Sequence, residues 1–222
     1  MRCGAVVNIR PPVTLPGAPA KVTLPEGTEL VRLHAAHRPA GAFNPVLAHS
    51  FYGGGRFDAT AFDEYGYVYA GLTSAAAVCE SLLRSIPFER DAQPRTVSRT
   101  ALRGRKLSFL RLTTDVTVLP LVSGRDLAAV AQDAWLTQTE AADYPFTRHW
   151  GHWIREQTTP WAQGFLWPSK REPADQVVVL FGDRCPPGVL GELGPSPVDF
   201  ETPEGEEWLN AVLEPYRAKV AP

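Results

Sequence analysis

Apolar and polar residues recur along the chain with two different periods, and these periods predict its secondary structure. Short runs rich in apolar, aromatic and β-branched residues, bounded by turn residues, predict strands. We expect strands at 29–35, 67–71, 106–112, 115–121, 164–167 and 176–181. The last of these contains VVVLF and is apolar on both faces, which is typical of a strand in the middle of a core.

Apolar residues at helical spacing predict the helices. Thr73 or Ser74 is expected to cap a helix that continues to Ile86 and ends at Pro87. The same spacing predicts further helices at 125–134, 144–157 and 204–219.

The chain of 222 residues fits one domain with additional segments at both ends. Residues 1–28, rich in Pro, Gly and Val, are expected to form an extended N-terminal arm, and residues 29–182 the domain itself. Residues 183–222 are expected to be a Pro/Gly linker followed by an amphipathic helix, packed on the domain or on a partner. A homodimer or a partner contact through this tail, or through the Trp-rich segment near Trp150, is one expectation.

Composition limits the classes of partner. The formal net charge is −2, so no overall field attracts nucleic acid or a membrane surface. No apolar run reaches the ~18–20 residues of a spanning helix, and the N-terminus does not resemble a signal peptide. Three cysteines without CxxC spacing indicate a reducing, cytoplasmic setting.

Two arginines are candidates for binding an anion. Arg32 lies on the first expected strand between Val31 and Leu33, whose side chains point to the opposite face. A buried guanidinium needs an anionic partner, which is either a ligand or an acid of the chain itself. Arg56 follows three glycines at 53–55, where the backbone can approach a ligand closely and a guanidinium suits phosphate; an ordinary hairpin turn is the alternative.

Tyr69 and Glu80 are the next candidates. Tyr69 can stack on a planar heterocycle or be an ordinary core tyrosine. Glu80 shares a helix face with Ala76 and Ala77, which leave room for a ligand. A carboxylate there can stabilise positive charge on a ribose during glycosidic cleavage. The alternative is a solvated carboxylate paired with Arg84 four residues later.

Ser169 follows Pro168 in the turn between two expected strands. Its hydroxyl can orient an acid or bind a leaving amide, or it can simply be a turn or cap serine. His149 and His152 suggest a metal site, but no cluster of Cys or acids completes a ligand set, so no metal is expected.

The order of these segments resembles the RES domain family, named for its Arg, Glu and Ser. The segments are LVRLH, GGGRFD, YVYAGLTSAAAVCE and, before a hydrophobic strand, LWPS. The resemblance runs from Leu30 to Phe181. It implies an α+β fold, with an ADP-ribosyltransferase-like split β core and flanking helices, that holds NAD in a cleft.

The resemblance also implies roles by position. Arg32 and Arg56 match the family arginines that contact pyrophosphate or ribose, and Tyr69 matches a tyrosine at the nicotinamide end. Glu80 and Ser169 match the glutamate and serine that give the family its name.

His34 is similar to a His or Tyr near the first arginine, which assigns it to NAD binding as well. The expected function is cleavage of the nicotinamide–ribose bond of NAD, as a glycohydrolase or phosphorylase that is the toxin of a bacterial toxin–antitoxin pair. A protein ADP-ribosyltransferase, a non-catalytic nucleotide-binding module and a pure interaction protein remain alternatives. The sequence does not choose between water, phosphate and a protein side chain as the acceptor.

Overall fold

The computed structural model describes residues 10–88, 93–194 and 196–222. Its strands are β1 (Val22–Leu24), β2 (Glu29–Ala35), β3 (Tyr67–Gly71), β4 (Arg95–Val97), β5 (Arg105–Leu112), β6 (Val116–Pro120), β7 (Gly164–Pro168), β8 (Gln176–Phe181), β9 (Leu190–Glu192), β10 (Val198–Asp199) and β11 (Ala218–Val220). Nine of them form one sheet in the order β1-β6-β7-β8-β3-β2-β5-β10, with β9 also paired to β5. Neighbouring strands in it are antiparallel except β6 and β7. The other two strands, β4 and β11, form a small parallel sheet.

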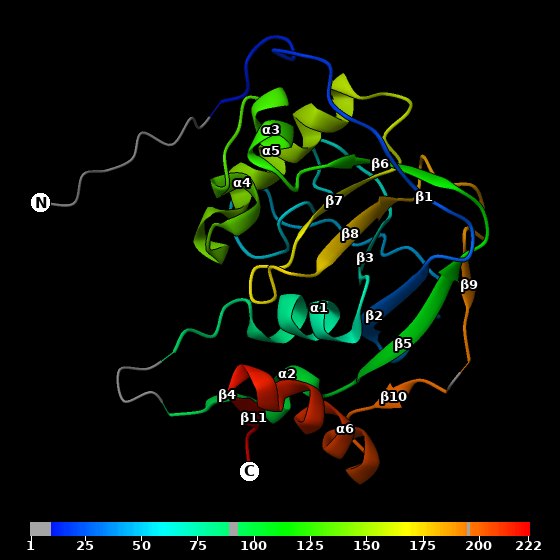
Figure 1. Ribbon diagram of the computed structural model, residues 1–222, viewed down its shortest axis with the longest axis vertical. Helices are drawn as coiled ribbons and strands as arrows, with labels where there is room; N and C mark the ends of the chain where they lie inside the picture. Colours follow the sequence, from blue (N-terminus) through cyan, green and yellow to red (C-terminus); the bar gives the residue numbers. More distant parts are fainter. Residues whose placement is uncertain (1–9, 89–92, 195) are drawn as a thin grey trace, which may run out of the picture.

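Helices cover one face of the large sheet in two groups. They are α1 (Ser74–Val78), α2 (Arg99–Leu102), α3 (Gly124–Ala129), α4 (Trp135–Gln138), α5 (Tyr144–Gln157) and α6 (Pro203–Leu213), with a π segment η1 (Cys79–Leu83) and two 3-10 turns, η2 (Ala141–Asp143) and η3 (Glu214–Tyr216). In Figure 1, α3, α4 and α5 gather at one end of the molecule and α1, α2 and α6 at the other. None of the described helices is long and apolar enough to cross a membrane.

Three buried clusters account for these layers. Leu127, Leu136 and Trp150 of the first helix group pack on Phe165 and Phe181 of the sheet. The second group packs on β2 and β5 through Val78, Leu83, Leu102, Leu209 and Leu213. The opposite face of the sheet is covered by loops and by the start of β9, where Ala40, Val189 and Leu190 pack against Leu30, Val68 and Leu180.

The strand and helix predictions are largely confirmed. β2, β3, β8 and α5 have the predicted bounds, and β5, β6 and β7 differ by one residue at one or both ends. Thr73 is the cap of α1, since its Oγ1 accepts a hydrogen bond from the Ala76 amide at 3.0 Å. The helix passes into the π segment η1 instead of continuing regularly to Ile86.

Both terminal segments differ from expectation because they belong to the sheets. The arm contributes β1, which pairs with β6, while residues 1–9 of that arm lie outside the described residues. The expected linker at 183–203 contains β9 and β10, and both pair with β5. The terminal helix ends at Leu213 and not at Lys219, because the chain turns at η3, with Arg217 in the left-handed region, and continues as β11.

The helix expected at 125–134 is shorter and starts one residue earlier. It ends at Ala129, and two residues later Ala131 has a φ of 57°, which a continuing α-helix does not allow. Three short elements, β4, α2 and α4, were not predicted, because three or four residues show too little of either period.

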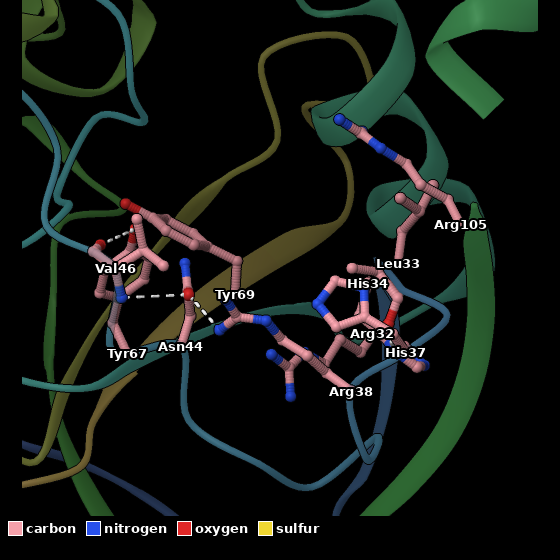
Figure 2. A pocket seen from close by; sticks show the side chains of 11 residues that line it. Arg32, Leu33, His34, His37, Arg38, Asn44, Val46, Tyr67, Tyr69 and Arg105 are labelled. Carbon is pink, nitrogen blue, oxygen red and sulfur yellow. Dashed lines mark hydrogen bonds between the residues drawn. The ribbon is translucent and has the colours of Figure 1, made fainter. Parts of the chain in front are cut away.

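The β core is split between β2 and β3. These strands pair at one position, Val31 with Gly71, whereas β2 pairs with β5 along its whole length. From this junction the two strands separate, and side chains of both strands face the space between them (Figure 2). The α+β fold with a split β core and flanking helices is therefore confirmed.

Gly71 is required where the split begins. An added Cβ would lie 2.4 Å from the Ala77 amide nitrogen and 2.7 Å from the Thr73 carbonyl oxygen, both backbone atoms that cannot move aside.

We expect Gly71→Ala to lower the free energy of unfolding by ~1–3 kcal/mol, as over-packing does. Urea unfolding measures this. Gly124→Ala is the control, because a Cβ there meets nothing within 4 Å; equal stability of the two variants would contradict the prediction.

Candidate functional site

A pocket of about 360 Å³ opens where β2 and β3 separate (Figure 2). Its walls are Arg32, Leu33 and His34 of β2, Tyr67 and Tyr69 of β3, and side chains of the loop that follows β2. A narrow crevice of about 20 Å³ adjoins it, because Leu33 and Tyr69 line both spaces. Glu80 lines the crevice. The split therefore connects an open pocket to a buried carboxylate.

The pocket is lined by basic side chains and by no acid. The basic ones are Arg32, His34, His37, Arg38 and Arg105. Because no described carboxylate lies within ion-pair distance of these arginines, their charge is available to an anion.

Arg32 is buried at 5% exposure, and its charge is met by carbonyl groups alone. Its Nη1 donates to the carbonyl oxygens of Ala40 at 2.5 Å and Ala42 at 2.6 Å. Burial, with a smaller effect of nearby Arg38, lowers the pKa of Arg32 to about 10. Arg32 forms no ion pair with an acid among the described residues. Arg32 is thus a fixed, incompletely neutralised cation in the pocket wall.

His34 has both ring nitrogens engaged by the protein. Nδ1 lies 2.9 Å from the Ala35 carbonyl oxygen and therefore carries the proton, so Nε2 accepts from the Ser108 hydroxyl at 2.8 Å. Burial lowers the pKa of His34 and favours this neutral form. Only the face of its ring remains for a ligand.

Tyr69 stands at the boundary between the pocket and the crevice. Its hydroxyl oxygen accepts a hydrogen bond from the Phe57 amide at 2.8 Å, and its ring meets the Trp167 ring edge to face at 6.1 Å. Burial raises its pKa well above the usual value, so the hydroxyl keeps its proton and remains a donor. Tyr69 is therefore both a core residue and a wall of the site.

Glu80 is a buried carboxylate on the π segment η1, with 7% exposure. Its Oε2 accepts a hydrogen bond from the Lys170 amide at 3.0 Å. The alternative of a solvated pair with Arg84 is wrong, since the Arg84 guanidinium lies over the Tyr144 ring, 5.1 Å from its centre. Single π turns are rare in proteins as a whole, but those that occur are often found at functional sites.

Arg56 is fully buried and lines neither the pocket nor the crevice. Its Nη1 donates to the Leu136 carbonyl at 3.2 Å, and its Nη2 donates to the Tyr144 hydroxyl at 3.4 Å. Burial lowers its pKa, while the charges of Tyr144 and Glu80 act in the opposite direction. The structure thus brings Arg56 into the electrostatic surroundings of Glu80 and not to the wall of the pocket.

Ser169 is fully buried in the loop between β7 and β8. Its amide donates to the Asp175 carbonyl at 2.9 Å, and the next residue, Lys170, contacts Glu80. Its hydroxyl is one of a few buried polar groups without a partner among the described residues, as are Nε of Arg56 and Nε1 of Trp167. Ser169 lines neither the pocket nor the crevice, so the structure places it in the support of the Glu80 loop.

Two residues that support the glycine turn were not identified from the sequence. Arg148 of α5 is 1% exposed and donates to the carbonyls of Gly53, Gly55 and His49 at 2.7, 3.1 and 2.8 Å. The Asp58 carboxylate accepts from the Gly55 amide at 2.6 Å. The one signal in the sequence is an arginine on the apolar face of the helix predicted at 144–157. Arg38 and Arg105 carry no local signal, since only the fold brings them to the pocket.

His149 and His152 lie on α5 away from this pocket and line a separate surface groove. His152 contacts the Asp58 carbonyl oxygen at 3.3 Å. Nearby Arg155 is held by ion pairs to Asp63 at 2.8 Å and Asp183 at 2.9 Å. Within residues 10–88, 93–194 and 196–222, no group of three or more His, Cys, Asp or Glu side chains is arranged to hold a metal ion.

Comparison with solved structures gives a fold likeness to the M. tuberculosis MbcT–MbcA toxin–antitoxin complex. The TM-score is 0.57 at 20% sequence identity, and the match covers 85% of this chain and 92% of the other. Comparison with curated proteins gives no match.

The model of the RES domain matches residues 29–200. This range begins at β2, includes the arginines, Glu80 and Ser169, and extends through β9 and β10, the strands that the sequence analysis placed in a linker. The match covers most of the chain, and the chain therefore belongs to the RES domain family.

Proposed function

We propose that this protein is an NAD-consuming enzyme that cleaves the nicotinamide–ribose bond, and that it is the toxin of a toxin–antitoxin pair. The observation that carries the proposal is the position of Glu80, a buried carboxylate at the inner end of a basic, acid-free pocket. This arrangement suits a ligand with phosphates at one end and a centre of developing positive charge at the other.

Binding begins with the phosphates. Arg32 offers a guanidinium that is already fixed by two carbonyls, so little side-chain entropy is lost when an anion binds. The ring of Tyr69 forms the wall at the entrance to the crevice, where a planar nicotinamide ring can pack. A pyrophosphate at Arg32 then directs the nicotinamide ribose toward Glu80.

Cleavage follows from the charge of Glu80. When the C–N bond breaks, its electron pair leaves with nicotinamide, which becomes neutral, and positive charge develops on the ribose. An ionised carboxylate nearby stabilises this oxocarbenium-like transition state. The carboxylate is oriented by the hydrogen bond that its Oε2 accepts from the Lys170 amide, and its charge acts on buried Arg56 nearby.

The acceptor completes the reaction by forming a bond to the same ribose carbon. Water gives ADP-ribose and releases a proton, and inorganic phosphate gives the phosphorylated product. A crevice of about 20 Å³ has room for a water, whereas phosphate needs more space and a protein side chain needs a still wider approach. We therefore rank breakdown of NAD by water or phosphate above modification of a target protein, with a non-catalytic nucleotide-binding module as a further alternative.

The toxin role rests on family membership and on the fold likeness to a toxin–antitoxin complex. Loss of NAD would stop growth, and an antitoxin that covers the pocket would prevent this loss.

The chemical test is incubation of the purified protein with NAD, with and without added phosphate, followed by chromatography of nicotinamide and the ADP-ribose products. Nicotinamide release that requires a protein target, without free ADP-ribose species, would favour the transferase alternative.

Glu80→Gln tests the carboxylate. We expect the variant to remain folded and to lose about 10²–10³-fold in the rate of NAD cleavage, the usual cost of removing one well-placed electrostatic group. Nicotinamide release measures the rate, and circular dichroism checks the fold. Glu64→Gln, at an exposed position, is the control and should keep the wild-type rate. An unchanged rate in Glu80→Gln would remove Glu80 from the mechanism.

Arg32→Lys tests the guanidinium. A lysine ammonium bonded to the Ala40 and Ala42 carbonyls has one N–H left and cannot form the two-pronged contact that a guanidinium makes with phosphate. We expect the KM for NAD to rise about tenfold or more, since a hydrogen bond to a charged group contributes roughly 1.5–3 kcal/mol. Steady-state kinetics measure this, with Arg103→Lys at an exposed position as the control. A KM equal to that of the wild type would make Arg32 a purely structural residue.

A further inference from the structure

We propose that the pocket prefers a dinucleotide with a third phosphate on its adenosine ribose, the NADP class, over NAD. The inference rests on the proposed function, since it concerns the substrate of the same site. It follows from where the basic residues stand along the cleft and from the absence of any carboxylate in the pocket wall.

The direction of the bound dinucleotide follows from β2. Val31 and Leu33 line the crevice with Glu80, whereas Ala35 lines the pocket at the other end of the strand. Four residues of a strand span roughly 13 Å. With the nicotinamide ribose at Glu80, the adenosine half therefore lies toward the end of β2 and the loop that follows it.

Two arginines that line the pocket start from this outer end. Arg105 of β5 is paired in register with Ala35, and Arg38 lies in the loop after β2. Arg38 is half-buried and oriented by a hydrogen bond from its Nη1 to the Asn44 side-chain oxygen at 2.5 Å. Figure 2 shows both side chains in the pocket wall, on either side of His34. Arg32, a neighbour of Arg38 in the same wall, is assigned to the pyrophosphate.

Among the described residues, no carboxylate forms an ion pair with Arg38 or Arg105. Where a protein binds NAD and excludes NADP, a carboxylate commonly accepts the hydrogen bonds of the adenosine ribose and repels a phosphate there; where NADP is preferred, an arginine takes this place. Here the outer end offers two arginines and no acid, which is the arrangement that suits a phosphate.

The test compares NADP and NAD as substrates and as ligands of the full chain. In the wild type we expect kcat/KM to be about tenfold higher for NADP, equivalent to about 1.4 kcal/mol. We expect this ratio to fall between low and high salt, because the outer arginines are solvent-accessible. Arg38→Gln and Arg105→Gln should each remove most of the preference, because they lower kcat/KM for NADP by more than they lower kcat/KM for NAD.

Arg111→Gln is the matched control, because Arg111 is an exposed arginine on the same strand as Arg105 and does not line the pocket. Its ratio of NADP to NAD should equal that of the wild type. Titration calorimetry with Glu80→Gln, which binds without rapid turnover, gives the same ratio as dissociation constants. Absence of turnover with both substrates would overturn the proposed function, and the calorimetric ratio would still decide this inference.

Two results would overturn the NADP preference. One is equal or tighter binding of NAD by Glu80→Gln together with an equal or higher kcat/KM for NAD in the wild type. The other is an equal loss for both substrates in Arg38→Gln and Arg105→Gln, which would assign these arginines to the pyrophosphate shared by the two dinucleotides.

Discussion

The single paired position between β2 and β3 is the constraint on which the site depends. Val31 and Gly71 are in register there, and the strands then separate, so that polar side chains of both line an open pocket. Gly71 is also where the backbone of α1 approaches most closely, which a side chain would prevent. The same junction therefore opens the pocket and fixes the start of the helix that leads to Glu80.

Electrostatics give the two ends of this cleft opposite characters. In the pocket, the Arg32 and Arg38 guanidiniums are held by carbonyls and by an amide side chain instead of carboxylates, so their charge is not cancelled. At the inner end, the Glu80 carboxylate accepts a hydrogen bond from a backbone amide, and its charge acts on buried Arg56. A ligand that is anionic at one end and becomes cationic at the other fits both.

Glu80 also depends on segments distant from it in the sequence. The loop that carries Lys170 is joined to the C-terminal segment, because the Tyr216 hydroxyl donates to the Glu172 carboxylate. Arg171 of the same loop donates to the Leu83 carbonyl at 3.3 Å, at the end of the π segment. The C-terminal α6 and β11 are therefore part of the support of the site, and they pack on the domain itself.

The sequence alone determined the longer elements and the identity of the family, because long elements show a clear period and the RES segments follow in order. Local pattern thus predicted β2, β3, β8 and α5, and it singled out Glu80. Only the tertiary structure decided that Arg56 lies beside Glu80, outside the pocket, and that Arg38 and Arg105 line that pocket. It also decided that the supposed linker and tail complete the sheets. Local periodicity cannot predict these results, because strand pairing and the burial of a charge depend on residues far apart in the chain.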